Sequence, residues 1–160
     1  MKVEQVMCPN TKTCRSSDSL DRAAHLMWEN DCGCVPIVDD EGRGVGMITD
    51  RDICMAAYTQ GRPLAHLRVG AAMAHALRSC RATDTVAEAE NIMRAAQVRR
   101  LPVVDPEGHV IGLLSLNDIA REGARQRATS SKPEIPAEDV AATLGAICAL
   151  RGERQVAAAA

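Results

Sequence analysis

Two stretches of sequence, VPIVDDEGRGVGMITDRDI (Val35–Ile53) and LPVVDPEGHVIGLLSLNDI (Leu101–Ile119), decide the fold of this chain. They align without a gap. Each has a β-branched run with a proline, an acidic turn that ends in glycine, a second apolar run and a Gly-x-x-Thr/Ser-x-x-Asp ending. The same register continues outward to three further pairs: Met7 and Met73, Cys14 and Cys80, Met27 and Met93. A register kept over such a length indicates that the chain contains one unit twice.

Each unit is expected to fold as β-α-β-β-α. Asp18 and Asp84 are expected to cap the first helix of each unit, because an apolar stripe at helical spacing follows each of them. The proline-containing runs have strand length, and the Asp-rich turns predict a hairpin with the run that follows. The expected strands are 12–15, 35–38 and 44–48, with 78–81, 101–104 and 110–114 as their copies; the expected closing helices are 50–58 and 116–125.

Composition narrows the class of protein. The formal net charge is −2, and a partner of duplex nucleic acid is not expected without a basic surplus. Trp28 and Tyr58 are the only aromatic residues, so a stacking platform for single-stranded nucleic acid is not expected either. The sequence has no apolar run long enough to span a membrane and begins without a signal-peptide core, so we expect a cytoplasmic protein that does not bind a membrane.

The end of the chain departs from the repeat. Residues 128–136 read as a polar linker, and apolar residues at helical spacing then predict an amphipathic helix: Val140, Leu144, Ile147 and Cys148. This helix is expected either to pack on the core or on a second copy, or to cover a ligand. The last ten residues, RGERQVAAAA, are expected to fray.

The Gly-x-x-Thr/Ser-x-x-Asp ending carries the candidate chemistry. Thr49 and Ser115 stand where a strand is expected to give way to a helix, so each is a candidate helix cap. A helix N-terminus suits a phosphate, and Asp52 or Asp118 one turn later can accept hydrogen bonds from a ribose diol. The alternative is a plain capping arrangement with no ligand.

The repeat resembles the cystathionine β-synthase (CBS) domain, and the resemblance covers about residues 1–125. It implies a mixed α/β (α+β) fold in which two pseudo-symmetric β-α-β-β-α repeats pack through their sheets, with a C-terminal helix added. We expect repeat 1 at 1–62, repeat 2 at 63–125, and the linker and helix at 126–160. The resemblance also implies two clefts, each built crosswise from both repeats and each a candidate adenosine-ligand site.

The family pattern assigns residues to each cleft. In cleft 1, Thr49 and Asp52 would serve phosphate and ribose, and the purine would lie against Val98, Arg99 and Arg100, with Arg51 and Arg78 nearby. In cleft 2, Ser115 and Asp118 would serve phosphate and ribose. The purine there would lie against Cys32, Gly33 and Cys34, with Lys12 nearby. Arginine forks suit phosphate oxygens, so cleft 1 is expected to bind a phosphorylated ligand better.

These expectations describe a regulatory module and not an enzyme. No catalytic triad, Walker-type loop or dinucleotide fingerprint is found in the sequence, so no catalytic residue is assigned. The expected ligands are AMP, ADP or ATP, with S-adenosylmethionine or NAD less favoured, and no cofactor or metal is required. The signal would pass through an unknown downstream protein or a homodimer, whose expected contact positions are these: Ile53, Met55, Ala56, Ile119 and Ala120.

Two alternatives remain open from the sequence. One is a ligand-free structural or dimerisation module, in which the aspartates only cap helices. The other is a redox or metal responder built on Cys32 and Cys34, although the odd count of seven cysteines and their irregular spacing favour reduced, packed thiols.

Overall fold

A computed structural model describes residues 1–130 and 132–149 of the chain. Its strands are β1 (Cys8–Pro9), β2 (Cys14–Arg15), β3 (Cys34–Val38), β4 (Gly44–Thr49), β5 (Cys80–Arg81), β6 (Arg100–Val104) and β7 (Val110–Ser115). Its helices are α1 (Leu20–Glu29), α2 (Asp50–Gln60), α3 (Val86–Ala96), α4 (Leu116–Thr129) and α5 (Ala137–Cys148), with short 3₁₀ turns η1 (Val3–Gln5), η2 (Leu64–His66) and η3 (Val69–Ala71). The predicted fraying of the last ten residues lies outside the described residues.

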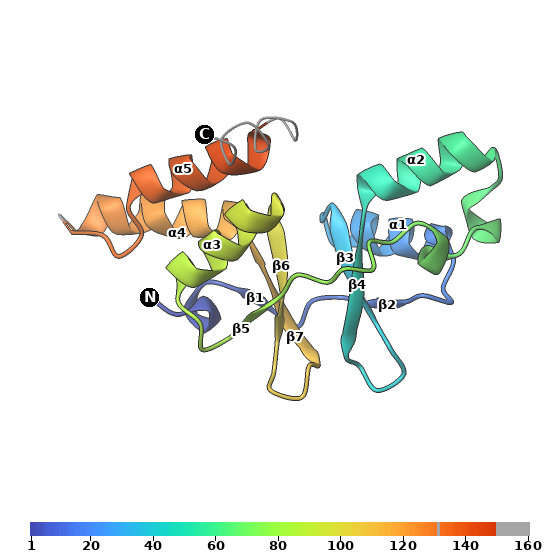
Figure 1. Ribbon diagram of the computed structural model, residues 1–160, viewed down its shortest axis with the longest axis horizontal. Helices are drawn as coiled ribbons and strands as arrows, with labels where there is room; N and C mark the ends of the chain where they lie inside the picture. Colours follow the sequence, from blue (N-terminus) through green and yellow to red (C-terminus); the bar gives the residue numbers. More distant parts are fainter. Residues whose placement is uncertain (131, 150–160) are drawn as a thin grey trace, which may run out of the picture.

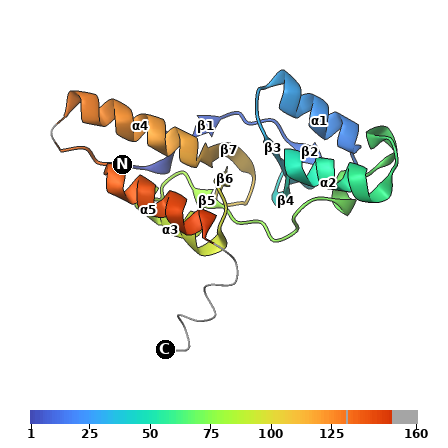
Figure 2. The same ribbon diagram turned by 90° about the horizontal axis from the view of Figure 1, so that it is seen from above.

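The two repeats form two units that lie side by side, each with a sheet and a pair of helices (Figures 1 and 2). One sheet has the order β2-β3-β4 and the other the order β1-β7-β6-β5. The hairpins β3–β4 and β6–β7 are antiparallel, while β2 and β5 join them as short parallel edge strands. The predicted mixed α/β fold of two pseudo-symmetric repeats is confirmed.

The duplication extends to backbone detail. Both hairpins carry a register shift before their last pair, at Ile37/Val38 and at Val103/Val104. Both turns hold a glycine at positive φ, +86° at Gly42 and +91° at Gly108, where a side chain would be strained. The hairpin turns also meet each other, since the amide of Gly44 donates to the carbonyl of Gly108 at 3.0 Å. The pseudo-symmetric units are therefore tied together at these tips.

The first residues of each repeat are exchanged between the units. Val3 packs in the core of the second unit, and its amide donates to the carbonyl of Asp84 at 2.9 Å. Val69, its copy, packs in the core of the first unit and donates to the carbonyl of Asp18 at 2.9 Å. Strand β1 likewise pairs with β7. Each packing unit thus consists of most of one repeat plus the first residues of the other.

The apolar stripes of the closing helices turn inward. Ile53, Ala56 and Ile119 are buried in the cores of their own units. The prediction that these three residues face a second copy is wrong, because each helix needs them to cover its sheet. Met55 and Ala120 are exposed, as the prediction required.

The caps of the first helices lie one residue later than predicted. The hydroxyl of Ser19 accepts from the amide of Arg22 at 3.2 Å, and Thr85 caps α3 in the same way. The predicted caps, Asp18 and Asp84, instead accept from amides three residues before them and close the strand-to-helix turn. Both residue types cap helices well, so their order in the sequence did not distinguish them.

The C-terminal helix packs on one unit only. Helix α5 lies over α3 and α4 of the second unit (Figure 1), and Val140 and Ile147 pack against the core of that unit. The segment before it is not a free linker, because Ile135 is buried and Gln126 accepts hydrogen bonds from the amides of Glu134 and Ile135. In the first unit the corresponding surface over α1 and α2 carries no helix among the described residues.

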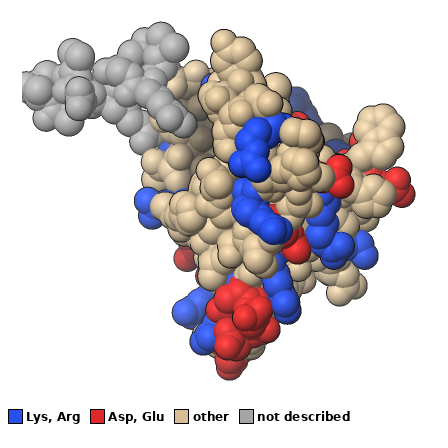
Figure 3. Space-filling model, turned by 90° about the vertical axis from the view of Figure 1, so that its right-hand side faces the viewer, with Lys and Arg blue, Asp and Glu red and all other residues tan. Residues whose placement is uncertain are grey.

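Charges of both signs are mixed on the surface of the first unit. Figure 3 shows this side, with lysine and arginine side chains beside acidic ones and an acidic group at the lower end. No helix in the described part of the chain is long and apolar enough to cross a bilayer.

Candidate functional site

The Thr/Ser-x-x-Asp motif forms the same capping box in both repeats. At the start of α2, the amide and hydroxyl of Thr49 donate to Oδ2 of Asp52 at 2.8 and 2.7 Å, and the amide of Asp52 donates back to Thr49 Oγ1 at 3.3 Å. Ser115 and Asp118 repeat this at the start of α4, at 3.0, 2.5 and 3.1 Å. The predicted caps Thr49 and Ser115 are confirmed.

The two aspartates differ in their second oxygen. Oδ1 of Asp118 is engaged by the guanidinium of Arg121, one turn along α4. Within the described residues, Oδ1 of Asp52 accepts no hydrogen bond and forms no ion pair. One repeat therefore keeps a half-buried carboxylate oxygen with free acceptor capacity, which a hydroxyl of a ligand needs.

Cleft 1 lies between the units and has a volume of about 510 Å³. Of the residues predicted for it, six line this cavity: Thr49, Arg51, Asp52, Val98, Arg99 and Arg100. Arg78 is exposed and does not line the cavity. Cys34, which was predicted only for cleft 2, also lines this cavity, and the remaining lining residues were not predicted: Met47, Ala74, Gln97, Ile147 and Ala149.

Three arginines line cleft 1 without a carboxylate partner among the described residues. Among the described residues, Arg51, Arg99 and Arg100 form no ion pair within 4.0 Å. Arg99 has one weak contact, from Nη2 to the thiol of Cys148 at 3.7 Å. Unpaired arginines around one cavity are suited to an anionic ligand, because their forks match phosphate oxygens.

The first amides of α2 are already used inside the protein. The amide of Asp50 donates to the carbonyl of Gly33 at 3.3 Å, that of Arg51 to Asp50 Oδ1 at 2.7 Å, and that of Asp52 to Thr49. The helix N-terminus thus offers less to a phosphate than the sequence suggested. Side-chain donors, chiefly the arginines, remain for an anion in cleft 1.

Cleft 2 is the pseudo-symmetric counterpart, with a volume of about 820 Å³. All six residues predicted for it line the cavity: Lys12, Cys32, Gly33, Cys34, Ser115 and Asp118. Arg100 lines this cleft as well as cleft 1. Alignment of the repeats could have found further lining residues, since Leu113 and Asn117 match Met47 and Arg51 of cleft 1.

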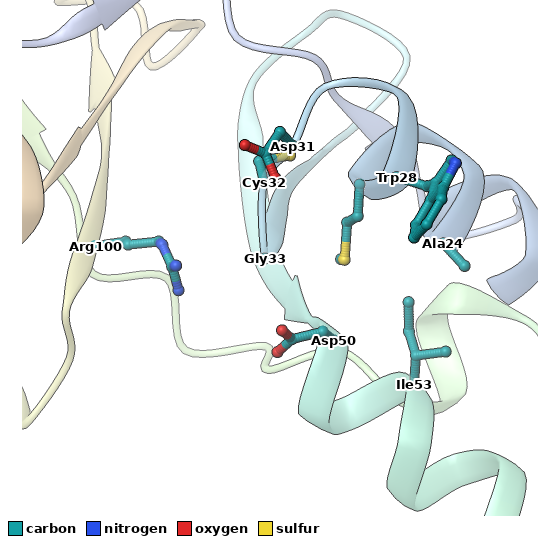
Figure 4. Close-up of a pocket in the computed structure, with 9 residues that line it drawn as sticks. Ala24, Trp28, Asp31, Cys32, Gly33, Asp50, Ile53 and Arg100 are labelled. Carbon is teal, nitrogen blue, oxygen red and sulfur yellow. The ribbon is translucent and has the colours of Figure 1, made fainter.

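Arg100 also borders a third hollow, of about 490 Å³, beside α1 and α2. Figure 4 shows its side chain reaching from the second unit toward Asp50 and Gly33 of the first. A Cβ added at Gly33 would lie 3.0 Å from Asp50 Oδ2 and 3.4 Å from Arg100 Nη2. An added methyl group at Gly33 would therefore press on the ends of these two side chains, which meet at this hollow.

The thiol of Cys34, which borders both clefts, is a poor candidate for redox chemistry. Cys34 is buried, and burial raises the pKa of its thiol to about 11, although the charge of Arg100 acts in the opposite direction. The reactive form of a cysteine is the thiolate, which such a pKa suppresses at neutral pH. Burial likewise raises the pKa of Cys14 to about 11 and that of Cys80 to about 12.

One group of potential metal ligands stands out in the described part of the chain. Asp105, Glu107 and His109 bring ligand atoms within 4.8 Å of one another at the β6–β7 turn. Nδ1 of His109 already lies 2.9 Å from Asp105 Oδ2. This group is at the hairpin tip and does not include Cys32 or Cys34.

The protein is an internally duplicated α/β protein. Its two units together form two clefts, each lined by residues of both repeats. The sequence profile of the CBS domain matches residues 3–58 and 69–125, and the chain belongs to the CBS domain family. It is 32% identical over 118 residues to the CBS domain-containing protein YhcV of Bacillus subtilis, an alignment that covers 74% of this chain and 82% of YhcV.

Solved structures share the fold. Hypoxic Response Protein I with two coordinated zinc ions superposes with a TM-score of 0.69 at 30% identity, covering 76% of this chain and 98% of that one. CBSX2 of Arabidopsis thaliana in complex with AMP gives a TM-score of 0.68 at 26% identity, covering 79% of this chain and 98% of that one. The zinc ions and the AMP were found in those two proteins.

Proposed function

We propose that this CBS pair is a regulatory, non-catalytic module that binds an adenine nucleotide of the AMP, ADP or ATP type in cleft 1. The observation that carries the proposal is the meeting of three unpaired arginines with the free Oδ1 of Asp52 in one cavity of about 510 Å³. The arginines suit phosphate and the carboxylate suits a ribose diol. A cavity of this size is in the range of ligand sites.

The comparison with CBSX2 supports the same ligand class, since that CBS pair holds AMP. Cleft 2 is the weaker site in this proposal. The ion pair between Asp118 and Arg121 must open before Asp118 offers the oxygen that Asp52 already offers. Cleft 2 also has Asn117 and Gly33 where cleft 1 has Arg51 and Arg99 as repeat counterparts, while Arg100 borders both clefts.

The experiment is thermal melting of the protein with AMP, ADP, ATP, S-adenosylmethionine and NADH, repeated for Asp52→Ala and Asp118→Ala. Both substitutions remove a capping box, so each is expected to lower stability by about 1 kcal/mol without ligand. A ligand at ~100 times its dissociation constant adds about 2.7 kcal/mol. We expect Asp52→Ala to lose most of this gain and Asp118→Ala to keep it. Equal losses would contradict the asymmetry, and no shift with any ligand would favour a ligand-free structural module.

The output of the module would pass through a second copy or a downstream protein. The face of α1 and α2 supports pairing, because Trp28 and Tyr58 are each 83% exposed and Met55 lies beside them in the same unit. In the second unit the repeat counterparts of the two aromatic residues are Arg94 and Ala124. Light scattering of the wild type beside Trp28→Glu tests this: the dimer should give way to a monomer in the variant, and a monomeric wild type would leave the signal to another protein.

A further inference from the structure

Helix α5 breaks the pseudo-symmetry at cleft 1. Both clefts are lined by residues of the two repeats, but cleft 1 alone has Ile147 and Ala149, from the end of α5 and the residue after it, among its lining residues. The rest of α5 lies on α3 and α4, outside the cleft. The end of the C-terminal helix thus adds two apolar residues to the wall of cleft 1, and no described residue of α5 lines cleft 2.

The same residues hold the end of α5 and face the cleft. Nε2 of Gln97 donates to the carbonyl of Ala146 at 3.2 Å and to that of Ala149 at 3.0 Å. Two positions further along, Arg99 contacts the thiol of Cys148. Val98 lies between them, and the segment from Gln97 to Arg99 lines cleft 1. If this segment moves on ligand binding, the hydrogen bonds that hold the end of α5 must change as well.

About one turn before its end, α5 is held on α3 by a buried polar contact. Thr143 on α5 is fully buried, donates to Oε1 of Glu90 at 3.1 Å, and accepts from Nη1 of Arg94 at 2.8 Å. Buried polar groups of this kind fix one arrangement, because a shifted helix would leave them without partners. Helix α5 is therefore held in a defined position on α3 and α4, with its end at the cleft.

We infer that the end of α5 is part of the wall of the nucleotide site in cleft 1, where it packs on the purine beside Val98, and that ligand binding and α5 docking stabilise each other. The inference rests on the proposed function. It adds that α5 is the helix whose docking changes when the ligand binds. The chain has no phenylalanine, and neither Trp28 nor Tyr58 lines this cleft, so the contact with a base must come from arginine planes and aliphatic side chains, to which the end of α5 contributes Ile147 and Ala149. Because coupling between binding and docking is reciprocal, a ligand that contacts docked α5 must also hold it down.

The test compares two identical substitutions on one helix. Ala149→Trp puts a large side chain into cleft 1, while Ala141→Trp puts it on an exposed position of α5 outside the cleft. AMP is titrated calorimetrically into wild type, both variants and Asp52→Ala. We expect Ala149→Trp to weaken AMP binding by roughly tenfold or more, and Ala141→Trp to leave it within about twofold.

Hydrogen exchange supplies the reciprocal measurement. In the wild type, AMP should slow exchange of the amides of 140–148, and this slowing should be absent in Asp52→Ala. If AMP binds the wild type and fails to bind Asp52→Ala, yet Ala149→Trp binds normally and α5 exchange is unchanged, the coupling is wrong and the nucleotide site stands. If AMP does not bind the wild type at all, both the site and the coupling are overturned.

Discussion

Glu90 is a carboxyl group held almost entirely out of water. Its residue is only 3% exposed, on α3 beneath α5. Burial raises the pKa of Glu90 above the ordinary value of 4.5, while the hydrogen bond from Thr143 and the charge of Arg94 act in the opposite direction. The buried Glu90 lowers stability at neutral pH, but its hydrogen bond with Thr143 specifies the position of α5 on α3.

The raised pKa fixes the sign of a pH effect. Folded Glu90 keeps its proton at pH values where the unfolded chain has released it, so its contribution to stability falls as pH rises from about 4.5 through the folded pKa. Glu90→Gln removes this titration and is expected to reduce the loss of stability over that window. Urea unfolding of both proteins from pH 4 to 7 measures the difference between the two profiles.

Glu88, two residues earlier, is a matched control of opposite sign. The backbone and side-chain hydrogen bonds from Thr85 lower the pKa of this exposed carboxyl group. Its contribution is present above 4.5 and is lost as pH falls through the lowered pKa. Glu88→Gln should therefore lose stability at neutral pH. Identical pH profiles for Glu90→Gln and the wild type would contradict the account of the buried carboxyl group.

Among the elements, the contact of α4 with the segment before α5 shows why one unit carries a helix and the other does not. Gly123 of α4 faces Ile135, and a Cβ added at Gly123 would lie 3.1 Å from its Cγ2 and 3.3 Å from its carbonyl oxygen. The repeat counterpart in α2 is Ala57, which is half-buried. A missing side chain makes room for the returning chain in the second unit.

Gly123→Val is therefore expected to push Ile135 from its seat and loosen α5. Overpacking of this kind costs about 1–3 kcal/mol, and faster hydrogen exchange in α5 than in α1 would locate the effect. Ala57→Val is the matched control at the repeat counterpart, because α2 has no contact in the described chain that corresponds to that of α4 with α5; it should cost about the difference in helix propensity, well under 1 kcal/mol. Equal exchange in α5 for both variants would show that Gly123 does not seat the segment.

For the whole molecule, the sequence predicted the duplication, both hairpins and the capping boxes, because each is a local pattern written twice. The same alignment, with the family pattern, placed twelve of the thirteen site residues on the two clefts, all except Arg78. Three features escaped prediction because they depend on contacts between distant segments. These are the exchange of Val3 and Val69, the burial of Ile135 and the choice among the alternatives left open for the C-terminal helix, which packs on the second unit and whose Ile147 lines cleft 1.

The exchange also explains two glycines that the sequence marked only as repeated. A Cβ at Gly46 would lie 2.6 Å from the carbonyl oxygen of Ala74, and one at Gly112 would lie 2.9 Å from that of Cys8. Each is the point where the exchanged segment crosses the other hairpin, and the amide of Ala74 donates to the carbonyl of Met47 at 2.8 Å there. Backbone meets backbone at these crossings, so neither side can move alone.

Gly46→Ala is expected to destabilise the protein by about 1–3 kcal/mol, and Gly112→Ala by less, because its clash is smaller. Gly145→Ala on α5 is the control, since no atom lies within 4 Å of the added Cβ and the change should stabilise the helix by up to about 1 kcal/mol. Guanidinium unfolding followed by helical circular dichroism, which reports both units, and by hydrogen exchange of the α1 amides, which reports the first unit, measures the loss. Because the exchanged segments bind each unit to the other, both signals should move to a lower midpoint together in Gly46→Ala. Two separated transitions would mean that the crossings do not couple the units, and unchanged stability would mean that the approach at Gly46 has room for a methyl group.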